Sequence, residues 1–282
     1  MSYSPSSSVV AARKVFAARL QELRRNAGLT GAELSERCGW HKSKTSRLQA
    51  GLAAPSESDI RSWCAACGAE DEAEALIASA RAVDAMYVDW RRLERSGLRQ
   101  AQESVYDLYQ RTRTFRVYAS RVVPGMVQTR AYTTAVLSAV QRSRVSVDDV
   151  AAAVDARMER QRMLFSGSQT FALLIEESVL HSSVCDAETM RAQLRHLITV
   201  SGLARMSIGV LPFQRDRLRS PAEDFYMFDD LQTSVELVSG HLRLTQPHEI
   251  AMYARVFTQL SRMAVHGTKA RALIATVLES MG

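Results

Sequence analysis

Apolar residues recur at helical spacing along the first eighty residues, and glycines interrupt them at short intervals. Residues 9–27 place Phe16, Leu20 and Leu23 three to four positions apart, which predicts an amphipathic helix that ends at Gly28. Further short helices are predicted over residues 31–38, over residues 42–49, from a cap at Ser56 or Ser58 to Gly68, and over residues 71–82. The pattern therefore predicts an all-α domain of five helices in residues 1–82, beginning with a disordered arm at residues 1–8.

A tight turn at Gly39 joins the second and third predicted helices. Thr30 is a suitable N-cap for the second helix, and Glu33 three residues later completes a capping box. The positions predicted to face inward on these two helices are Leu34, Cys38, Thr45 and Leu48. Two such short helices joined by one tight turn are typical of a helix-turn-helix motif.

From residue 83 to residue 123 the pattern stays mostly helical, with a break near Gly97 and frequent arginines. This pattern predicts a helical connector. It leaves open whether the connector dimerises, contacts a DNA backbone or packs on the C-terminal domain of its own chain.

After Pro124-Gly125, which predicts a turn, helical and strand patterns alternate. Helices are predicted over residues 128–140, 150–165, 187–200 and 247–281, and short strands over residues 171–175, 206–211, 225–228, 234–238 and 241–244. The fold class expected for the whole chain is therefore multidomain. It consists of an all-α five-helix domain that contains the helix-turn-helix motif at residues 1–82, the helical connector at residues 83–123 and an α+β domain with a mixed sheet at residues 124–282.

Charge is distributed unevenly along the chain. The net charge is +6. Residues 1–55 hold nine basic and three acidic residues, which is 9 − 3 = +6, so the remainder of the chain sums to zero. A basic N-terminal module favours a polyanionic partner, because neutralised phosphates supply most non-specific affinity for nucleic acids. A solvated basic face without a partner is the alternative.

Hydrogen-bond donors occupy the outward positions of the third helix, namely Lys42, Ser43, Lys44, Ser46 and Arg47. A recognition helix presents its N-terminal residues to base edges in the major groove. We therefore expect Lys42, Ser43 and Lys44 to contact bases, and Arg47 to reach a base or a phosphate. Ser46 completes the predicted double-stranded DNA interface, and two further candidates for phosphate contacts are Thr30 and Arg19.

The segment from Leu29 to Leu48, with its Leu-Thr-x-x-Glu-Leu and Gly-Trp-x-x-Ser-Lys-x-Ser-Arg runs, closely resembles the Xre (lambda-repressor-like) helix-turn-helix family. The resemblance continues in the run Phe115 to Thr129, which contains Val-Pro-Gly-Met-Val-Gln-Thr, and in residues 156–162, 193–197 and 206–213. These segments are similar to the antitoxin-like C-terminal domain of the actinobacterial, WhiJ-like branch of that family.

What the resemblance implies is a transcriptional regulator, more often a repressor, whose C-terminal domain binds a small companion protein that modulates DNA binding. Half-site logic adds the expectation of a homodimer. An antitoxin-like interaction module with autoregulatory DNA binding is the main alternative, and an enzyme with a DNA-tethering domain is a third.

Other chemistry is less favoured by the sequence. Cys38-x-x-His41 and Cys64-x-x-Cys67 have ligand-like spacing for zinc, but the three cysteines are predicted to face inward as small apolar residues. Neither a phosphate-binding glycine loop nor a nucleophile elbow is present. We therefore expect no cofactor, no metal and no catalytic residues. With four cysteines, no apolar run of membrane-spanning length and no signal peptide, a cytoplasmic, nucleoid-associated protein is expected.

Overall fold

The computed structural model describes residues 6–89, 97–182, 184–213, 217, 223–237 and 240–281, and the side chains of residues 6–12, 82–89 and 144 are outside this description. The chain divides into two compact units, Met1–Val88 and Asp89–Gly282. Each unit has its own buried cluster of apolar side chains. Of the arm predicted at residues 1–8, residues 1–5 lie outside the described part, and residues 6–8 belong to the first helix.

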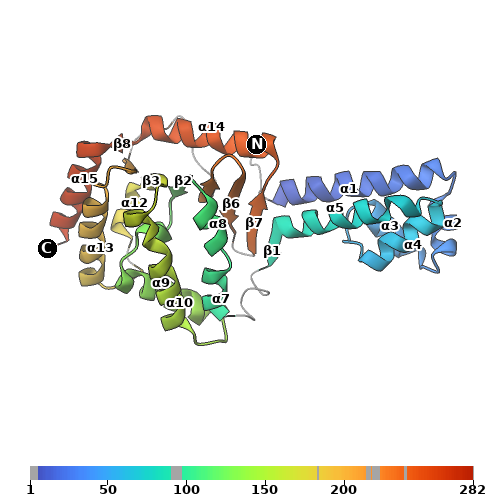
Figure 1. The fold of residues 1–282 in the computed structure, drawn as a ribbon, viewed down its shortest axis with the longest axis horizontal. Helices are drawn as coiled ribbons and strands as arrows, with labels where there is room; N and C mark the ends of the chain where they lie inside the picture. Colours follow the sequence, from blue (N-terminus) through green and yellow to red (C-terminus); the bar gives the residue numbers. More distant parts are fainter. Residues whose placement is uncertain are drawn as a thin grey trace. The chain divides into compact units, whose positions relative to one another are not determined.

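The first unit is helical, as the sequence predicts (Figure 1). Its helices are α1 (Ser6–Asn26), α2 (Gly31–Arg37), α3 (Lys42–Gln49), α4 (Glu57–Cys67) and α5 (Ala73–Met86), with a 3-10 turn at Glu70–Glu72. Trp63 of α4 lies at the centre of the core, and its indole N–H donates to the carbonyl of Leu20 on α1 at 3.0 Å. Because this bond satisfies the one polar atom of the ring, a tryptophan can be buried here at no polar cost.

Short helices in this unit begin and end at residues with the appropriate chemistry. The hydroxyl of Thr30 accepts from the amide of Glu33, and the Glu33 carboxylate accepts in turn from the amide of Thr30, so the predicted capping box is present. Ser56 and Asp59 form a second capping box at the start of α4. Gly39 has φ 65° between α2 and α3, a left-handed conformation that glycine adopts without a steric penalty. The sharp turn of the motif therefore depends on that residue.

The second unit contains a mixed sheet with helices on both of its faces. Its strands are β2 (Thr114–Ala119), β3 (Thr170–Glu176), β4 (Met206–Leu211), β5 (Phe225–Phe228), β6 (Gln232–Glu236), β7 (Gly240–Leu244) and β8 (Val265–His266). Across the sheet they lie in the order β7-β6-β5-β2-β3-β4-β8. Strands β2, β3 and β4 pair in parallel, and the other pairs are antiparallel. This arrangement confirms the predicted α+β class and mixed sheet.

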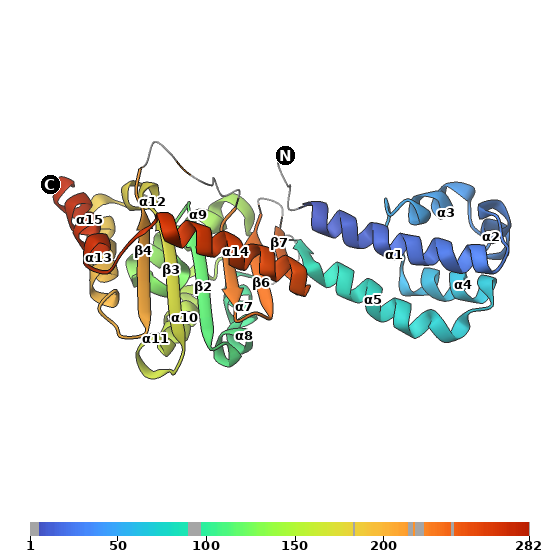
Figure 2. The same ribbon diagram turned by 90° about the horizontal axis from the view of Figure 1, so that it is seen from above.

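Two layers of helices enclose the sheet (Figure 2). One long helix, α14 (Pro247–Met263), crosses one face and contacts β2, β4 and β6. The opposite face carries α7 (Gly97–Glu103), α8 (Tyr106–Arg111), the 3-10 turn Gly125–Val127, α9 (Arg130–Arg144), α10 (Val150–Gln161), α11 (Met163–Ser166), α12 (Glu177–His181), α13 (Ala187–Val200) and α15 (Gly267–Ser280). Phe115, Val117, Phe171 and Leu173 alternate along β2 and β3 into the core of that face.

The helical prediction for residues 83–123 is wrong in two places. Tyr87–Asp89 form a short strand, β1, at the boundary between the two units, and Thr114–Ala119 form β2, which lies between β3 and β5. Residues 90–96 lie outside the described part. Residues 114–119 form a strand rather than a helix because Phe115, Val117 and Tyr118 are aromatic or β-branched residues that pack on both faces of a sheet. The frequent arginines concealed that short apolar run.

Smaller differences occur elsewhere. The strand predicted at residues 234–238 begins two residues earlier, as β6, and residue 238 lies outside the described part. The single helical region predicted from residue 247 to residue 281 is two helices, because β8 pairs with β4 between them. Gly267, with φ 57°, allows the chain to turn from β8 into α15.

Candidate nucleic-acid interface

Helices α2 and α3 are held together by a buried polar contact as well as by apolar packing. Leu34 and Leu48 are buried in the core of the first unit. Beside them Ser35 Oγ lies 2.7 Å from Thr45 Oγ1 and 2.7 Å from the carbonyl oxygen of Gly31, and both Ser35 and Thr45 are 2% exposed. A hydroxyl pair that is withdrawn from water fixes one arrangement of the two helices, since any displacement leaves a buried oxygen without a partner. The inward position of Thr45 is predicted by the helical spacing, whereas the burial of Ser35 is not.

The C-terminal end of α3 is also fixed. Gln21 of α1 donates from Nε2 to the carbonyl of Gln49 at 2.6 Å, which satisfies one of the free carbonyls of the last turn. At the other end, the Nδ1 atom of His41 accepts from the amide of Ser43 at 3.3 Å and lies 2.8 Å from the Ser43 hydroxyl. The helix is therefore capped by an imidazole that carries its proton on the other nitrogen.

Four of the predicted DNA-contacting residues lie on one outward face of α3. At 100° per residue, Lys42, Ser43, Ser46 and Arg47 fall within one arc of the helix, opposite the buried pair Thr45 and Leu48. All four are exposed. Neither Lys42 nor Arg47 forms an ion pair with any described residue. This face therefore presents two uncompensated cations and two hydroxyls on a rigid support.

Lys44 differs from its neighbours on the same helix. Its ammonium lies 2.6 Å from Oδ1 of Asp59 on α4 and 4.4 Å from the centre of the Trp40 ring. Both contacts draw the side chain toward α4 and away from the arc of Lys42 and Arg47. The structure therefore places Lys44 between two helices of its own unit. No spacing in the sequence indicates this, because Asp59 lies fifteen residues further along the chain.

Asp59 is the acidic centre of this contact. Burial by itself raises the pKa of its carboxyl, but the hydrogen bonds from Lys44 and from Ser56 together hold that pKa below its usual value. The carboxylate thus serves both as the partner of Lys44 and as the N3 residue of the capping box on α4. A change at Lys44 consequently affects the start of α4.

The two candidates for phosphate contacts have intramolecular partners. The Thr30 hydroxyl forms part of the capping box on α2. The guanidinium of Arg19 lies 2.6 Å from Glu22 and 2.7 Å from Glu72, and all three side chains are substantially exposed. Surface pairs of this kind contribute little and exchange readily with solvent. Thr30 and Arg19 therefore lie at the surface of the first unit, and each already has a partner within that unit.

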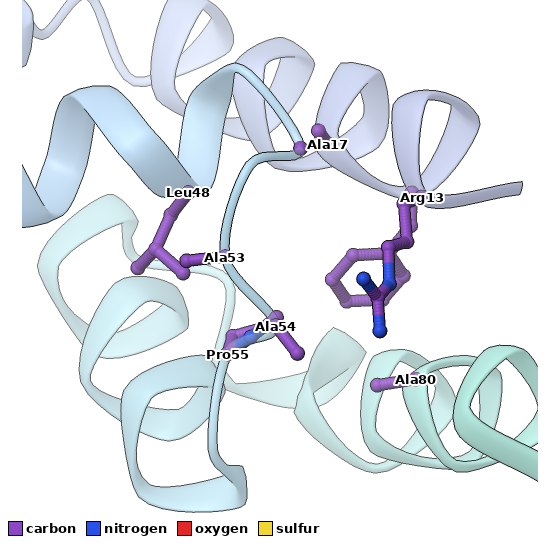
Figure 3. A pocket seen from close by; sticks show the side chains of 9 residues that line it. Arg13, Ala17, Leu48, Ala53, Ala54, Pro55 and Ala80 are labelled. Atoms are coloured by element: carbon purple, nitrogen blue, oxygen red, sulfur yellow. The ribbon is translucent and has the colours of Figure 1, made fainter. Parts of the chain in front are cut away.

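A small apolar pocket opens between α1, the segment after α3 and α5 (Figure 3). Arg13 contributes the one charged side chain to a lining that otherwise comes from Phe16, Ala17, Leu48, Gly51, Ala53, Ala54, Pro55 and Ala80. The lining contains no nucleophile and no acid.

The cysteines and histidines considered for zinc are not grouped as ligands. In the described part of the chain no three His, Cys, Asp or Glu side chains come together in a way that could hold a metal ion. Cys64 is buried, and Cys38 and Cys67 are partly buried beside it, all three as free thiols. Burial raises the pKa of Cys67 to about 11, so this group is a neutral, unreactive thiol near neutral pH. No described helix combines the length and the apolar character that crossing a membrane requires.

Comparison with known protein families finds one match in each unit. Residues 15–76 match the model of a helix-turn-helix domain, and residues 102–276 match the model of a domain of unknown function (DUF5753). Neither the curated proteins nor the solved structures contain a match. The first match covers α2, α3 and the contacts around them, which identifies the first unit as a helix-turn-helix domain typical of DNA-binding regulators. The second covers more than half of the chain, and the chain therefore belongs to the DUF5753 family, with a helix-turn-helix domain at its N-terminal side.

Proposed function

We propose that this protein is a sequence-specific DNA-binding transcriptional regulator in which α3 enters the major groove. The observation that carries the proposal is the outward face of α3, where Lys42 and Arg47 are exposed and unpaired among the described residues while the rest of the helix is fixed. Lysine and arginine suit guanine O6 and N7, and the hydroxyls of Ser43 and Ser46 can donate to or accept from either base pair.

The proposed roles differ among the seven candidate residues. Lys42 and Ser43 contact base edges from the first turn of α3, Arg47 reaches a base or a phosphate from its last turn, and Ser46 lies beside them. Lys44 acts mainly through Asp59 and Trp40, as a support for α3. Thr30 and Arg19 contribute phosphate contacts at the margin of the interface, which in the case of Arg19 requires exchange of its surface ion pairs.

The second unit is proposed to supply dimer contacts and a surface for an effector or for a small companion protein. The resemblance to Xre-type, WhiJ-like regulators supports this assignment, as it supports repression rather than activation and a location at the nucleoid. Dimerisation follows the logic that two recognition helices bind two half-sites one helical turn apart.

Selection of genomic DNA fragments by the purified full-length protein, at about 0.15 M salt, tests the regulator proposal. We expect enrichment of a short palindromic motif near a small number of promoters, and loss of that enrichment in the Arg47→Ala variant. Recovery of random fragments by both proteins would reject sequence-specific binding. Co-purification of one small protein in fixed ratio, together with absence of an enriched motif, would favour the antitoxin-like interaction module instead.

A further inference from the structure

Two arginines of the second unit lie one helical turn apart on α10, away from any carboxylate partner. Arg160 is 7% exposed, and Arg157 is partly exposed. Neither of them forms an ion pair with a described residue. Burial, and after it the charge of Arg160, lowers the pKa of Arg157 to about 10, with Glu236 contributing a weaker attraction from beyond ion-pair distance. Two neighbouring cations without a close counter-ion are an unfavourable arrangement in a folded protein.

Neutral amides and an aromatic ring surround these guanidinium groups instead. The Gln102 side-chain oxygen accepts from Arg157 Nε at 3.0 Å and from Arg160 at 3.1 Å, and the Gln102 carbonyl accepts from Arg160 at 2.6 Å. Arg160 also lies 4.6 Å from the centre of the Tyr109 ring. Gln128 accepts from the NH1 group of Arg157 at 2.8 Å. These contacts orient both groups without neutralising them, and the NH2 group of Arg157 has no partner among the described residues.

A rigid loop lies against Arg157. Gln128 donates to the carbonyl of Val123, Gln161 donates to the carbonyls of Gly125 and Gln128, and Gln193 donates to the carbonyl of Val127. Three glutamine side chains thus hold the turn that follows β2. A Cβ atom on Gly125 would lie 3.5 Å from the NH1 group of Arg157, so the backbone of this turn lies directly against the guanidinium.

A tyrosine hydroxyl completes the cluster. The amide of Gly125 donates to Tyr226 Oη at 3.3 Å, which leaves the hydroxyl hydrogen of Tyr226 free to donate. It has no acceptor among the described residues. Burial raises the pKa of Tyr226 well above its usual value, so the group is a neutral donor at all physiological pH values. Arg157, Gly125 and Tyr226 are each partly exposed and come from α10, the loop after β2 and β5.

We propose that Arg157, oriented by Gln102 and Gln128, and the hydroxyl of Tyr226 form a binding site for a small oxyanion, a phosphate or a carboxylate, on the second unit. The NH2 group of Arg157, which has no partner among the described residues, donates a charge-assisted hydrogen bond to such a group, and the hydroxyl supplies a second donor. The bound anion would neutralise the charge that the protein itself leaves unpaired. The site stands without the proposed function, whereas a role for the anion as an effector of DNA binding rests on it.

Calorimetric titration of the full-length protein with inorganic phosphate, against sodium chloride of equal ionic strength, tests the site directly, and a parallel titration with citrate separates phosphate from carboxylate. We expect saturable binding of one of these anions at one site per chain. Arg157→Gln should weaken it by more than about tenfold, and Tyr226→Phe, which keeps the ring and removes only the hydroxyl, by up to about tenfold. Arg47→Ala is the matched control on the other unit and should leave it unchanged.

Absence of saturable binding by either anion overturns the proposal, as does binding that Tyr226→Phe and Arg157→Gln leave at the wild-type value, or binding that Arg47→Ala abolishes. Circular dichroism establishes that each variant is folded, and Tyr226→Phe decides the matter should Arg157→Gln unfold. DNA affinity is measured separately. If the wild-type protein binds no DNA sequence specifically, the regulator proposal is rejected and the anion site still stands.

Discussion

Helices α3 and α10 each carry two cations that form no ion pair with a described residue, and the surroundings of the two pairs differ. On α3, Lys42 and Arg47 are exposed at no desolvation cost, and they are available to any polyanion that approaches. On α10, Arg157 and Arg160 are drawn into the fold and oriented by amides, which restricts them to a small ligand of fitting shape. The number of charges on a helix thus says little about function until the partners of each charge are known.

The largest effect should come from removing one arginine from each helix and measuring the affinity of the two variants for DNA. Arg47→Ala should weaken operator binding by about 1–3 kcal/mol if Arg47 contacts a base, and Arg157→Gln should leave it near the wild-type value in the absence of added anion. Fluorescence anisotropy on operator and random DNA over a series of salt concentrations measures both. An equal loss on operator and random DNA would place Arg47 on a phosphate, and an equal loss in the two variants would end the distinction between α3 and α10.

A second effect concerns the buried hydroxyl pair that fixes α3 against α2. Ser35→Ala leaves the buried Thr45 hydroxyl without its partner and should lower the free energy of unfolding by about 1–3 kcal/mol. The double variant Ser35→Ala, Thr45→Val removes both hydroxyls and should recover part of that loss. Chemical denaturation of the two variants and of Thr45→Val completes the cycle. Strict additivity of the two single losses would show that the hydroxyl pair carries no coupling.

The first unit follows from its sequence because its determinants are local. Capping boxes at Thr30 and Ser56, glycine turns and apolar positions at helical spacing all act within a few residues. The strand β2 could not be predicted from the sequence, since its pairing with β3 and β5 joins residues more than fifty positions apart. The arginines around it also give the segment the polar spacing of an exposed helix. The same reason applies at the sites, where Asp59 reaches Lys44 and Tyr226 reaches Gly125 only in the folded chain.

Lys44 provides a smaller test, because the sequence alone would group it with Lys42. Lys44→Met keeps apolar contact with Trp40 and removes the ion pair with Asp59, so we expect a loss of stability of at most about 1 kcal/mol, given that the lysine is 42% exposed. Lys42→Met is the matched control and should not change stability. In the anisotropy assay Lys44→Met should weaken operator and random DNA alike. A selective loss on the operator would return Lys44 to the group of base-contacting residues.

The smallest effect is the pH dependence of that same contact. The pKa of Asp59 is lowered in the folded protein, so its contribution to stability is fully present above the ordinary aspartate pKa of about 3.9 and is lost as the pH falls through the lower, folded value. The melting temperature of wild-type protein should therefore fall more steeply below about pH 4 than that of Asp59→Asn, which lacks the titrating group. At pH 7 the order reverses, and Asp59→Asn should be the less stable protein, because the neutral amide cannot form an ion pair with the Lys44 ammonium. If the melting temperatures of the two proteins fall equally below about pH 4, Lys44 and Asp59 are each solvated by water rather than paired. Lys44 would then be as available to DNA as Lys42 and Arg47.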